Sequence, residues 1–372
     1  MKVLHVTNQF WPNIGGIEKF TMDLCLKTRP LGVESRVLCL NKGKNDRSSL
    51  PKTAEINGIK IRRMPFLNLH YYKPAILPIK ELAWADVIHV HGVSALSDYL
   101  VLTKGSHKKP IVLNTHGGLF HTQSLSGVKK MYFFGGQKLM LKGVDLVVAD
   151  SPHDFELFKP IAPRMELIEN GVDFSALSKK TKKKQGVFLY VGRLSKNKRL
   201  DLLLKTFGEL KKQGRDFELR LAGPDWEHLA EELKRLAKEL KIEKQVVFLG
   251  EVSDQQLAAE YLSAQFFVSA SRYEAFGIST IEAMAAGCVP IVSDIPSFRH
   301  FINDGKDGYL ADFSDPEKTA GLIAKVTGKK SGVSKKARQS ALRFSWEKKA
   351  KEWLNAYRRL VKEAEKKNGR KV

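Results

Sequence analysis

The sequence of 372 residues predicts an α/β protein made of two consecutive doubly wound units, each with a largely parallel sheet. Short, nearly continuous apolar runs alternate with segments of helical length, which is typical of parallel strands that helices cover on both faces. A lysine-rich run at 178–185 (SKKTKKKQ) interrupts this alternation and has the composition of a solvated linker. The alternation then restarts, and the total length suits two domains.

The first half contains six apolar runs that we expect to be strands. Segments of helical length lie between several of them, at 15–29, 94–106 and 126–143, and the stretch 55–63 reads as a hairpin-like irregular insertion. In chain order, the expected strands are 2–7, 35–40, 86–91, 110–115, 145–150 and 165–170.

The second half repeats this pattern and ends in an amphipathic helix. That helix places Trp346, Trp353 and Tyr357 on one face, and such a stripe usually packs against the protein. The expected strands are 186–192, 217–223, 245–250, 265–270 and 289–293, and the expected helices are 198–213, 226–240, 254–263, 276–286 and 315–326. The predicted domains are 1–183, 184–350 and a closing helix at 351–372 that packs back on the first domain.

The charge balance favours an anionic partner. Lys and Arg number 63 against 40 acids, a net charge of +23, which suits nucleic acid, anionic lipid or a phosphorylated substrate. No nucleic-acid recognition motif is present, so that class rests on charge alone. The three cysteines are scattered without a CxxC spacing, which argues against zinc and a disulfide framework and favours the cytoplasm. The first residues read as a strand rather than a signal peptide, and no apolar run is long enough to predict a spanning helix.

Three common phosphate-binding patterns are absent from the sequence. It contains neither the P-loop pattern GxxxxGK[ST] nor GxGxxG after the first strand, which argues against a P-loop and a dinucleotide cofactor. It also contains no Asp-x-Asp that could clamp a metal–diphosphate. We therefore expect no cofactor and no metal.

Three other signals lie at expected strand ends. Gly15 and Gly16 open the first expected helix, where free N–H groups can receive an anion; a plain glycine turn is the alternative. Arg193 and Lys198 follow a buried strand and could neutralise a departing diphosphate; a solvated basic loop is the alternative.

The third signal is a pair of glutamates at the start of an apolar helix. Glu274 and Glu282 are eight residues apart, so a continuous helix would turn through about 800° and bring them to one face. Glu282 lies among apolar residues and needs a partner or a ligand. The N–H groups of Phe276 and Gly277 begin the helix and can face an anion. A capping glutamate plus a surface acid is the alternative.

These motifs together resemble those of the family 4 retaining glycosyltransferases. The matching segments are NxGGxE at 13–18, THGG at 115–118, ENGVD at 169–173, VGRLSKNK at 191–198 and EAFGISTIEAMAAG at 274–287. The resemblance implies the GT-B fold, in which two Rossmann-like domains face across a cleft and the C-terminal helix crosses back. It also implies an N-terminal acceptor-binding domain and a C-terminal nucleotide-sugar-binding domain.

The resemblance also implies a role for each matching residue. Gly15 and Gly16 would border the donor phosphates and the acceptor pocket, and His116 would lie near the transferred sugar. The remaining roles fall in the second domain, apart from Ser151, which matches a family position whose role is less certain. Arg193 and Lys198 would hold the diphosphate, Glu274 the sugar hydroxyls and Glu282 the ribose, with backbone contacts from Ala275, Phe276, Gly277 and Ile278.

Four histidines near strand ends could instead be metal ligands. They are His89, His91, His116 and His121. No carboxylate triad accompanies them, so we interpret them as strand-end polar residues that line a cleft, with a metal site as the alternative.

A narrower resemblance concerns the substrate. Segments 91–104, 114–122 and 293–298 are similar to α-mannosyltransferases of xanthan- and acetan-type exopolysaccharide assembly. This similarity implies transfer of mannose from GDP-mannose to a polyprenyl-diphosphate-linked glycan. UDP-glucose or UDP-N-acetylglucosamine donors, and a sugar-nucleotide epimerase, stay open as alternatives.

The first half also has a composition suited to a membrane surface. Residues 57–142 carry 12 bases and 3 acids with aromatic residues between them, and 128–143 mixes lysine with Met, Tyr and Phe. We therefore expect peripheral contact with an anionic membrane, on the inner face of the cell membrane. An ordinary packed helix at 128–143 is the alternative.

Overall fold

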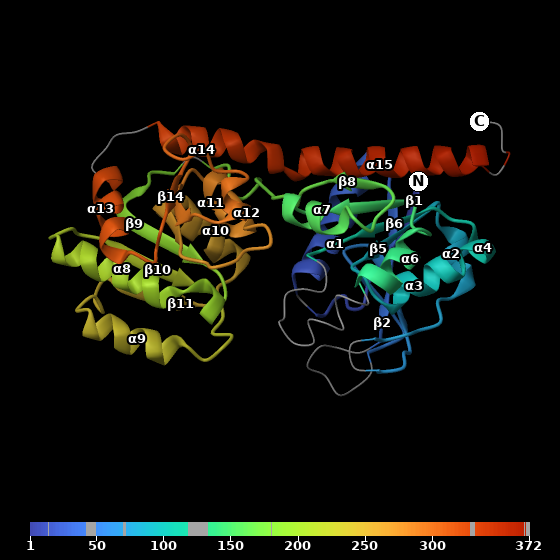
Figure 1. Ribbon diagram of the computed structural model, residues 1–372, viewed down its shortest axis with the longest axis horizontal. Coiled ribbons are helices and arrows are strands. Elements are labelled where there is room, and N and C mark those ends of the chain that lie inside the picture. Colours follow the sequence, from blue (N-terminus) through green and yellow to red (C-terminus); the bar gives the residue numbers. More distant parts are fainter. Residues whose placement is uncertain are drawn as a thin grey trace. The chain divides into compact units, whose positions relative to one another are not determined.

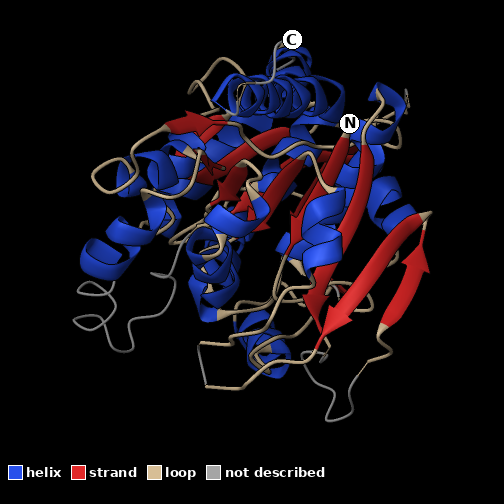
Figure 2. Ribbon diagram, turned by 90° about the vertical axis from the view of Figure 1, so that its right-hand side faces the viewer, coloured by secondary structure: helices blue, strands red, loops and turns tan. Residues whose placement is uncertain are grey.

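The computed structural model describes residues 1–13, 15–41, 50–69, 72–117, 133–179, 181–327, 332–367 and 369. The chain forms two compact units (Figure 1). The first consists of 1–171 together with 346–372, and the second of 172–345. Each unit is an α/β layer structure, and Figure 2, which faces the first unit, shows strands flanked by helices.

The first unit contains an eight-stranded sheet in the order β3-β4-β2-β1-β5-β6-β7-β8. All neighbouring strands are parallel except the β3–β4 pair. The strands are β1 (Lys2–Val6), β2 (Glu34–Leu40), β3 (Thr53–Ile56), β4 (Ile59–Met64), β5 (Val87–His91), β6 (Ile111–Asn114), β7 (Leu146–Ala149) and β8 (Met165–Leu167).

Helices connect these strands and cover the sheet. They are α1 (Gly16–Thr28), η1 (Arg29–Leu31), α2 (Ile79–Trp84), α3 (Ala95–Leu102), α4 (Lys104–His107), η2 (Phe133–Gln137), α6 (Lys138–Leu141) and α7 (Pro152–Phe158). The C-terminal helix α15 (Trp346–Lys367) returns to this unit.

The second unit contains a six-stranded, fully parallel sheet in the order β11-β10-β9-β12-β13-β14. Its strands are β9 (Lys184–Val191), β10 (Glu218–Ala222), β11 (Val246–Gly250), β12 (Ala264–Ser269), β13 (Val289–Ser293) and β14 (Tyr309–Ala311). Its helices are η3 (Lys196–Lys198), α8 (Leu200–Lys212), α9 (Ala230–Glu239), α10 (Asp254–Ser263), α11 (Ile278–Ala285), α12 (Pro296–Arg299), α13 (Pro316–Thr327), α14 (Val333–Ala341) and η4 (Leu342–Phe344).

The expected fold class is confirmed, because every predicted strand coincides with an observed one. The hairpin at 55–63 needs a correction. β3 and β4 do form an antiparallel hairpin, but β4 also pairs in parallel with β2 and so belongs to the main sheet rather than to an irregular insertion. Burial explains this, since Ile59 and Ile61 are 0% and 2% exposed and face the core.

The aromatic stripe of the C-terminal helix packs on the first unit. Trp346, Trp353 and Tyr357 are each at most 1% exposed and join a core cluster with Phe20 of α1. At the far end of α15, the Arg164 guanidinium and the Glu363 carboxylate form an ion pair with two N–O contacts of 2.6 and 3.1 Å. The closing helix is therefore part of the core of the first unit.

The unit boundaries lie at 171/172 and 345/346, whereas the sequence suggested 183/184 and 350/351. The N–H of Val172 donates to the Phe344 carbonyl at 2.7 Å, so the two crossing segments pair inside the second unit. The lysine-rich run suggested a linker, but it belongs to the second unit. Lys183 donates from Nζ to the Tyr261 carbonyl at 2.8 Å, and Lys184 already begins β9. None of the described helices has both the length and the apolar character needed to cross a bilayer.

Candidate active site

The loops after β9 and β10 approach each other closely at the carboxyl edge of the second sheet. Gly223 has a φ of +138°, and a Cβ there would stand 2.1 Å from the Gly192 carbonyl oxygen. A residue with a side chain would push the two loops apart. Glycine at this position therefore lets the Gly192–Arg193 segment lie against the end of β10.

Arg193 follows directly and is exposed. Its guanidinium carbon lies 5.1 Å from the centre of the Trp226 ring, and its carbonyl accepts a 3.0 Å hydrogen bond from the Tyr190 hydroxyl. Burial raises the pKa of Tyr190; the Glu274 charge raises it further and the Arg193 charge lowers it. Glu274 and Arg193 therefore lie near the same phenol. Among the described residues, no carboxylate forms an ion pair with Arg193.

Lys198 and Glu274 are in direct contact. The Lys198 ammonium lies 2.6 Å from Glu274 Oε1, and the two side chains are 15% and 16% exposed. The Ser271 hydroxyl donates to the same oxygen at 2.8 Å. The loops are also joined by Asn197, whose side chain donates to the Tyr273 carbonyl at 2.8 Å. Two of the five segments that carry the resemblance, 191–198 and 274–287, thus meet in one cluster, and their pairing was not predicted.

Helix α11 starts later than the sequence suggested. It begins at Ile278, and Gly277 precedes it with a left-handed φ of +89° and a position where a Cβ would stand 2.8 Å from the Phe298 ring. Residues 274–277 are not helical, so the argument that Glu274 and Glu282 share a face by helical rotation is wrong. Within this turn Phe276 is buried, while Ala275 and Ile278 are exposed.

Glu282 lies on α11 and has a buried partner. Its Oε2 accepts a 2.8 Å hydrogen bond from the hydroxyl of Tyr261, a residue of α10 that is 1% exposed. Burial, followed by the Glu282 charge, raises the pKa of Tyr261 well above its usual range, so the phenol stays a donor. The expectation that this carboxylate needs a partner is therefore met by Tyr261, which the sequence did not identify.

In the first unit, His116 lies in the loop after β6 with a φ of +46°. Its Nδ1 is 2.8 Å from Asp150 Oδ2, its Nε2 is 3.0 Å from His91 Nδ1, and the side chain is 7% exposed. Phe20 of α1 packs edge-on against the ring at 5.0 Å. Both ring nitrogens are therefore engaged within the unit.

Asp154 fixes the same loop from α7. Its Oδ2 accepts from the Gly117 N–H at 2.7 Å and from the Thr115 hydroxyl at 3.1 Å. Burial and then the Asp150 charge raise the pKa of Asp154, and these two hydrogen bonds oppose the rise. The Asp154 N–H donates to Ser151 Oγ at 3.2 Å, which makes Ser151 the N-cap of α7. This position has a structural function in the loop framework.

The other strand histidines do not line a cleft, and that interpretation is wrong for His89 and His91. Both are at most 2% exposed, and their rings stack 4.2 Å apart on one face of the sheet, against Trp353 of α15. Residues two apart on a strand share a face, and here that face is the covered one. His121 lies outside the described residues.

His5, His89 and His91 place ring nitrogens within 4.8 Å of one another, close enough to hold a metal ion. Burial lowers the pKa of His5 to about 3 and those of His89 and His91 well below their usual range. The group includes no carboxylate, so a dication would be buried without a neutralising charge. His5 Nδ1 and His91 Nε2 also already face each other at 3.0 Å. We interpret the three rings as neutral and hydrogen-bonded.

The paired glycines open α1 as predicted. Gly16 is its first residue, and Gly15 is the N-cap in extended conformation. A Cβ on Gly15 would stand 2.4 Å from Glu18 Oε2, whereas no atom of the described residues lies within 4 Å of one on Gly16. The free backbone at this helix start is compatible with an approaching anion or sugar.

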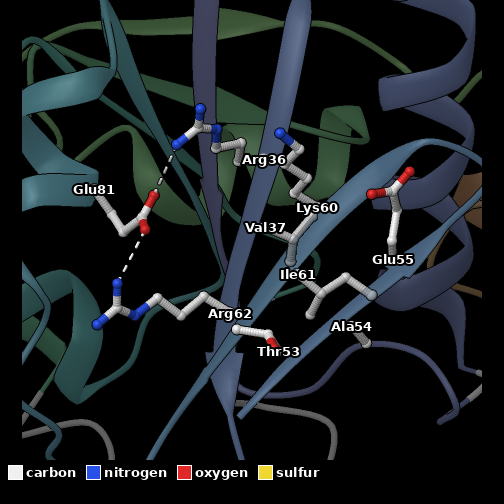
Figure 3. A pocket seen from close by; sticks show the side chains of 9 residues that line it. All are labelled: Arg36, Val37, Thr53, Ala54, Glu55, Lys60, Ile61, Arg62 and Glu81. Atoms are coloured by element: carbon white, nitrogen blue, oxygen red, sulfur yellow. Dashed lines mark hydrogen bonds and ion pairs between the residues drawn. The ribbon is translucent and has the colours of Figure 1, made fainter.

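A surface pocket in the first unit contains none of the predicted site residues. It lies between β2, β3, β4 and α2, and Figure 3 shows Arg36 and Arg62 pointing toward Glu81 from two strands. The N–O distances are 3.3 and 3.1 Å. Glu81 thus pairs with both arginines, and we assign this pocket no part in the site.

Two family models match the chain. Glycosyltransferase Family 4 matches residues 14–176, and Glycosyl transferases group 1 matches residues 173–353. The GDP-mannose:cellobiosyl-diphosphopolyprenol alpha-mannosyltransferase of Xanthomonas oryzae is 34% identical over 328 residues, covering 87% of this chain and 86% of that protein. The chain belongs to glycosyltransferase family 4. It is therefore a hexosyltransferase.

Further comparisons agree with this glycosyltransferase assignment. The Komagataeibacter xylinus protein of the same name is 28% identical over 373 residues, covering 97% of this chain and 94% of that one. The crystal structure of Anabaena HepE in complex with UDP matches with a TM-score of 0.76 and 17% identity, covering 96% of this chain and 99% of the other. That structural likeness supports the GT-B fold of the glycosyltransferase.

The Lys198–Glu274 pair of the glycosyltransferase generates a prediction about stability. In a double-mutant cycle with Lys198→Ala and Glu274→Gln, we expect a coupling energy of about 0.5–3 kcal/mol, because the contact is charge-assisted and mostly shielded from water. Urea unfolding of the four proteins measures it. The matched control is the Lys234–Glu231 pair on α9, which is 52% and 80% exposed and should couple by at most about 0.5 kcal/mol. Equal coupling in the two cycles would show that the partly buried Lys198–Glu274 contact stabilises the fold no more than an exposed pair does.

Proposed function

We propose that this hexosyltransferase moves mannose from GDP-mannose to a glycan carried on a polyprenyl diphosphate, in the synthesis of an exopolysaccharide or related glycoconjugate. The donor and acceptor are supported by the relatives, because the Xanthomonas and Komagataeibacter proteins both carry names that state them. The observation that carries the chemistry is the contact of Lys198 with Glu274 at the carboxyl edge of the second sheet, with Arg193 on the same loop as Lys198. Open α/β sheets bind ligands at this edge.

In this proposal, Arg193 and Lys198 receive the diphosphate of the donor. The guanidinium can bind two phosphate oxygens at once, and the ammonium contributes a compact second charge. Both charges gain in value as the sugar–phosphate bond breaks and negative charge collects on the leaving group. Two fixed cations at this position can perform the task that a metal ion performs elsewhere, so the reaction is proposed to be metal-independent.

The two glutamates have separate tasks in the proposal. Glu274, oriented by Ser271 and Lys198, accepts hydrogen bonds from hydroxyls of the transferred sugar. Glu282, held by the buried Tyr261 hydroxyl, accepts from the ribose. The N–H groups at the start of α11, from Ala275 to Ile278, face the phosphates, where the helix dipole favours negative charge.

We propose that transfer retains the configuration at the anomeric carbon by front-face substitution. The bond between the anomeric carbon and the phosphate oxygen breaks, and the acceptor oxygen forms its bond on the same face. The acceptor proton passes to the departing phosphate oxygen. A double displacement would instead need a nucleophile on the opposite face of the sugar, and we assign no residue to that role.

The first unit contributes the acceptor side of the proposed reaction. The loop of His116 and Gly117 is held at the carboxyl edge of its sheet by Asp150 and Asp154. We propose that this rigid loop contacts the transferred sugar. Gly15 and Gly16 leave open backbone at the start of α1. Ser151 supports this framework as a helix cap rather than as a ligand.

We also propose that the first unit touches an anionic membrane from the cytoplasmic side. Several large apolar side chains there are unusually exposed. They belong to α2, α3, α6 and the segment before α2, and Figure 1 draws the labelled helices together. These side chains are Leu67 (62%), Leu69 (54%), Ile76 (82%), Ile79 (74%), Leu102 (73%) and Leu139 (62%).

Exposed lysines accompany this apolar set. Lys80 follows Ile79 on α2, and Lys138 precedes Leu139 on α6. Apolar side chains that enter the interface, surrounded by lysines that meet anionic headgroups, are typical of peripheral membrane binding. A surface of this kind would bring the enzyme to a lipid-linked acceptor.

The proposed activity predicts acceptor-dependent mannose transfer. The purified chain, incubated with GDP-mannose and a polyprenyl-diphosphate-linked glycan, should form a mannosylated product, and EDTA should leave the rate unchanged. Product formation is followed by mass spectrometry, with UDP-glucose and UDP-N-acetylglucosamine as competing donors. Preference for a UDP-sugar would overturn the donor assignment alone. Interconversion of the sugar nucleotide without acceptor would favour an epimerase, and loss of activity restored by magnesium or manganese would refute metal independence.

The two glutamates should separate in steady-state kinetics. Glu282→Gln is expected to raise the donor KM more than it lowers kcat, because the ribose is bound equally before and during the reaction. Glu274→Gln should lower kcat, since the sugar changes charge and shape at the transition state. The control is Tyr357→Phe, at a buried position near the middle of α15. It should lower neither kcat alone nor the donor affinity alone. The opposite pattern would exchange the two roles, and no effect from either glutamate would refute both.

Membrane binding should be salt-sensitive and should depend on the exposed apolar side chains. With vesicles of phosphatidylcholine and phosphatidylglycerol, Ile76→Ser combined with Ile79→Ser should weaken binding by about 10-fold or more, given the transfer energy of such side chains. Sedimentation at low and high salt measures this. The control is Leu342→Ser in the second unit, which is 48% exposed in the parent and should bind like it. Binding that resists both salt and the double substitution would contradict the proposed surface.

A further inference from the structure

A line of hydrogen-bonded side chains crosses four adjacent strands of the first sheet. It runs from His5 on β1 to His91 at the end of β5, then to His116 after β6 and Asp150 after β7. The three contacts measure 3.0 Å from His5 Nδ1 to His91 Nε2, 3.0 Å from His91 Nδ1 to His116 Nε2, and 2.8 Å from His116 Nδ1 to Asp150 Oδ2. All four side chains are buried, with the most exposed at 8%.

The carboxylate at one end dictates which nitrogen carries the proton along the line. A carboxylate only accepts, so His116 carries its proton on Nδ1 and offers a lone pair at Nε2. His91 must then donate from Nδ1 and accept at Nε2. His5 in turn donates from Nδ1. Every imidazole therefore has the same tautomer, with the proton on Nδ1.

The other two arrangements are less favourable. If His116 carried its proton on Nε2, the bare Nδ1 would face the Asp150 carboxylate, and two acceptors would repel each other. If His116 were doubly protonated, the donor order along the line would reverse and His5 would bury an N–H at Nε2. That atom has no hydrogen-bond partner among the residues that the structure describes, and an unpaired donor in the core is costly. Burial also lowers the pKa values of His5 and His91, which keeps both rings neutral.

We propose that His91 is a positioning residue for the transfer reaction, and that its Nδ1–H holds the His116 ring and the attached loop in their working orientation. This inference rests on the proposed function, in which the His116 loop lies near the transferred sugar. His91 itself is 2% exposed and lies within the core of the first unit, so it acts through His116.

The surroundings explain why one hydrogen bond decides the orientation. The His116 ring is held by Asp150 on one side and by Phe20 on one edge, and His91 supplies the contact at Nε2. His116 has a left-handed backbone, which is strained for a residue with a side chain. Loss of the His91 contact therefore frees the ring to turn about Asp150 and the strained loop to relax.

Two substitutions of His91 separate positioning from packing. Asparagine places its amide where His91 has Nδ1, so His91→Asn keeps a donor toward His116 and loses the contact with His5. Glutamine places its amide where His91 has Nε2, so His91→Gln keeps the contact with His5 and loses the donor toward His116. Each variant gives up one buried hydrogen bond, and their melting temperatures should therefore be similar.

The kinetic result expected is a loss of kcat in His91→Gln of about 10-fold, with a donor KM close to that of the parent. His91→Asn should retain kcat within about twofold to threefold. Equal kcat in the two variants, or a higher kcat in His91→Gln, would overturn the positioning role. If both variants fail to fold, the tautomers measured below on the parent protein still test the order of donors and acceptors that the inference requires.

Nitrogen-15 spectra of histidine-labelled protein report the tautomers directly, because protonated and bare ring nitrogens have well-separated shifts. We expect His5, His91 and His116 each to carry a single proton on Nδ1. A proton on Nε2 of His91 would overturn the inference. This readout needs no substrate, so it is independent of whether GDP-mannose is the donor. Correct tautomers together with equal kinetics in the two variants would refute the positioning role and leave the proposed function standing.

Discussion

The contact between the Lys198 ammonium and Glu274 at 2.6 Å is the interaction on which the second unit's site depends. It joins the loop after β9 to the loop after β12, and these two strands are neighbours in a parallel sheet. Parallel strands deliver their carboxyl ends to one edge, so the sheet order itself brings distant sequence elements together. Because the pair is mostly shielded from water, it fixes both side chains at a place where Arg193 adds a further positive charge.

The strands could be predicted because the strands of a parallel sheet that is buried on both faces have nearly continuous apolar sequences. The misses have local causes. β4 alternates buried and charged residues, which suggested a peripheral hairpin, although it pairs with β2. β14 spans only Tyr309–Ala311 and is too short for a pattern. The lysine-rich run suggested a linker twelve residues beyond the actual unit boundary. A run of lysines indicates that a segment is exposed to solvent, but it does not indicate which domain core the flanking residues belong to.

The candidate site was predictable in its residues but not in its contacts. Motif spacing identified Lys198, Glu274 and Glu282, and the family resemblance identified His116. Tyr261, the partner of Glu282, and Asp150, the partner of His116, come from other elements and carry no motif. Asp150 had one available signal, since it directly follows the apolar run of β7. Gly277 has a left-handed backbone, so α11 begins only at Ile278. The periodicity of apolar residues could not have indicated this start. Histidines two apart on a strand share a face, but only the position of α15 decides that this face is covered.

We propose that the second unit recognises a nucleoside diphosphate through Arg193 and the Lys198–Glu274 pair. The most direct measurement is calorimetric titration of the parent and of Arg193→Ala with guanosine, GMP and GDP in the presence of EDTA. We expect a large gain in affinity from GMP to GDP in the parent. Most of this gain should disappear in Arg193→Ala, while the affinity for guanosine should be unchanged. A parent that binds GMP and GDP equally, or a gain that survives in Arg193→Ala, would contradict it.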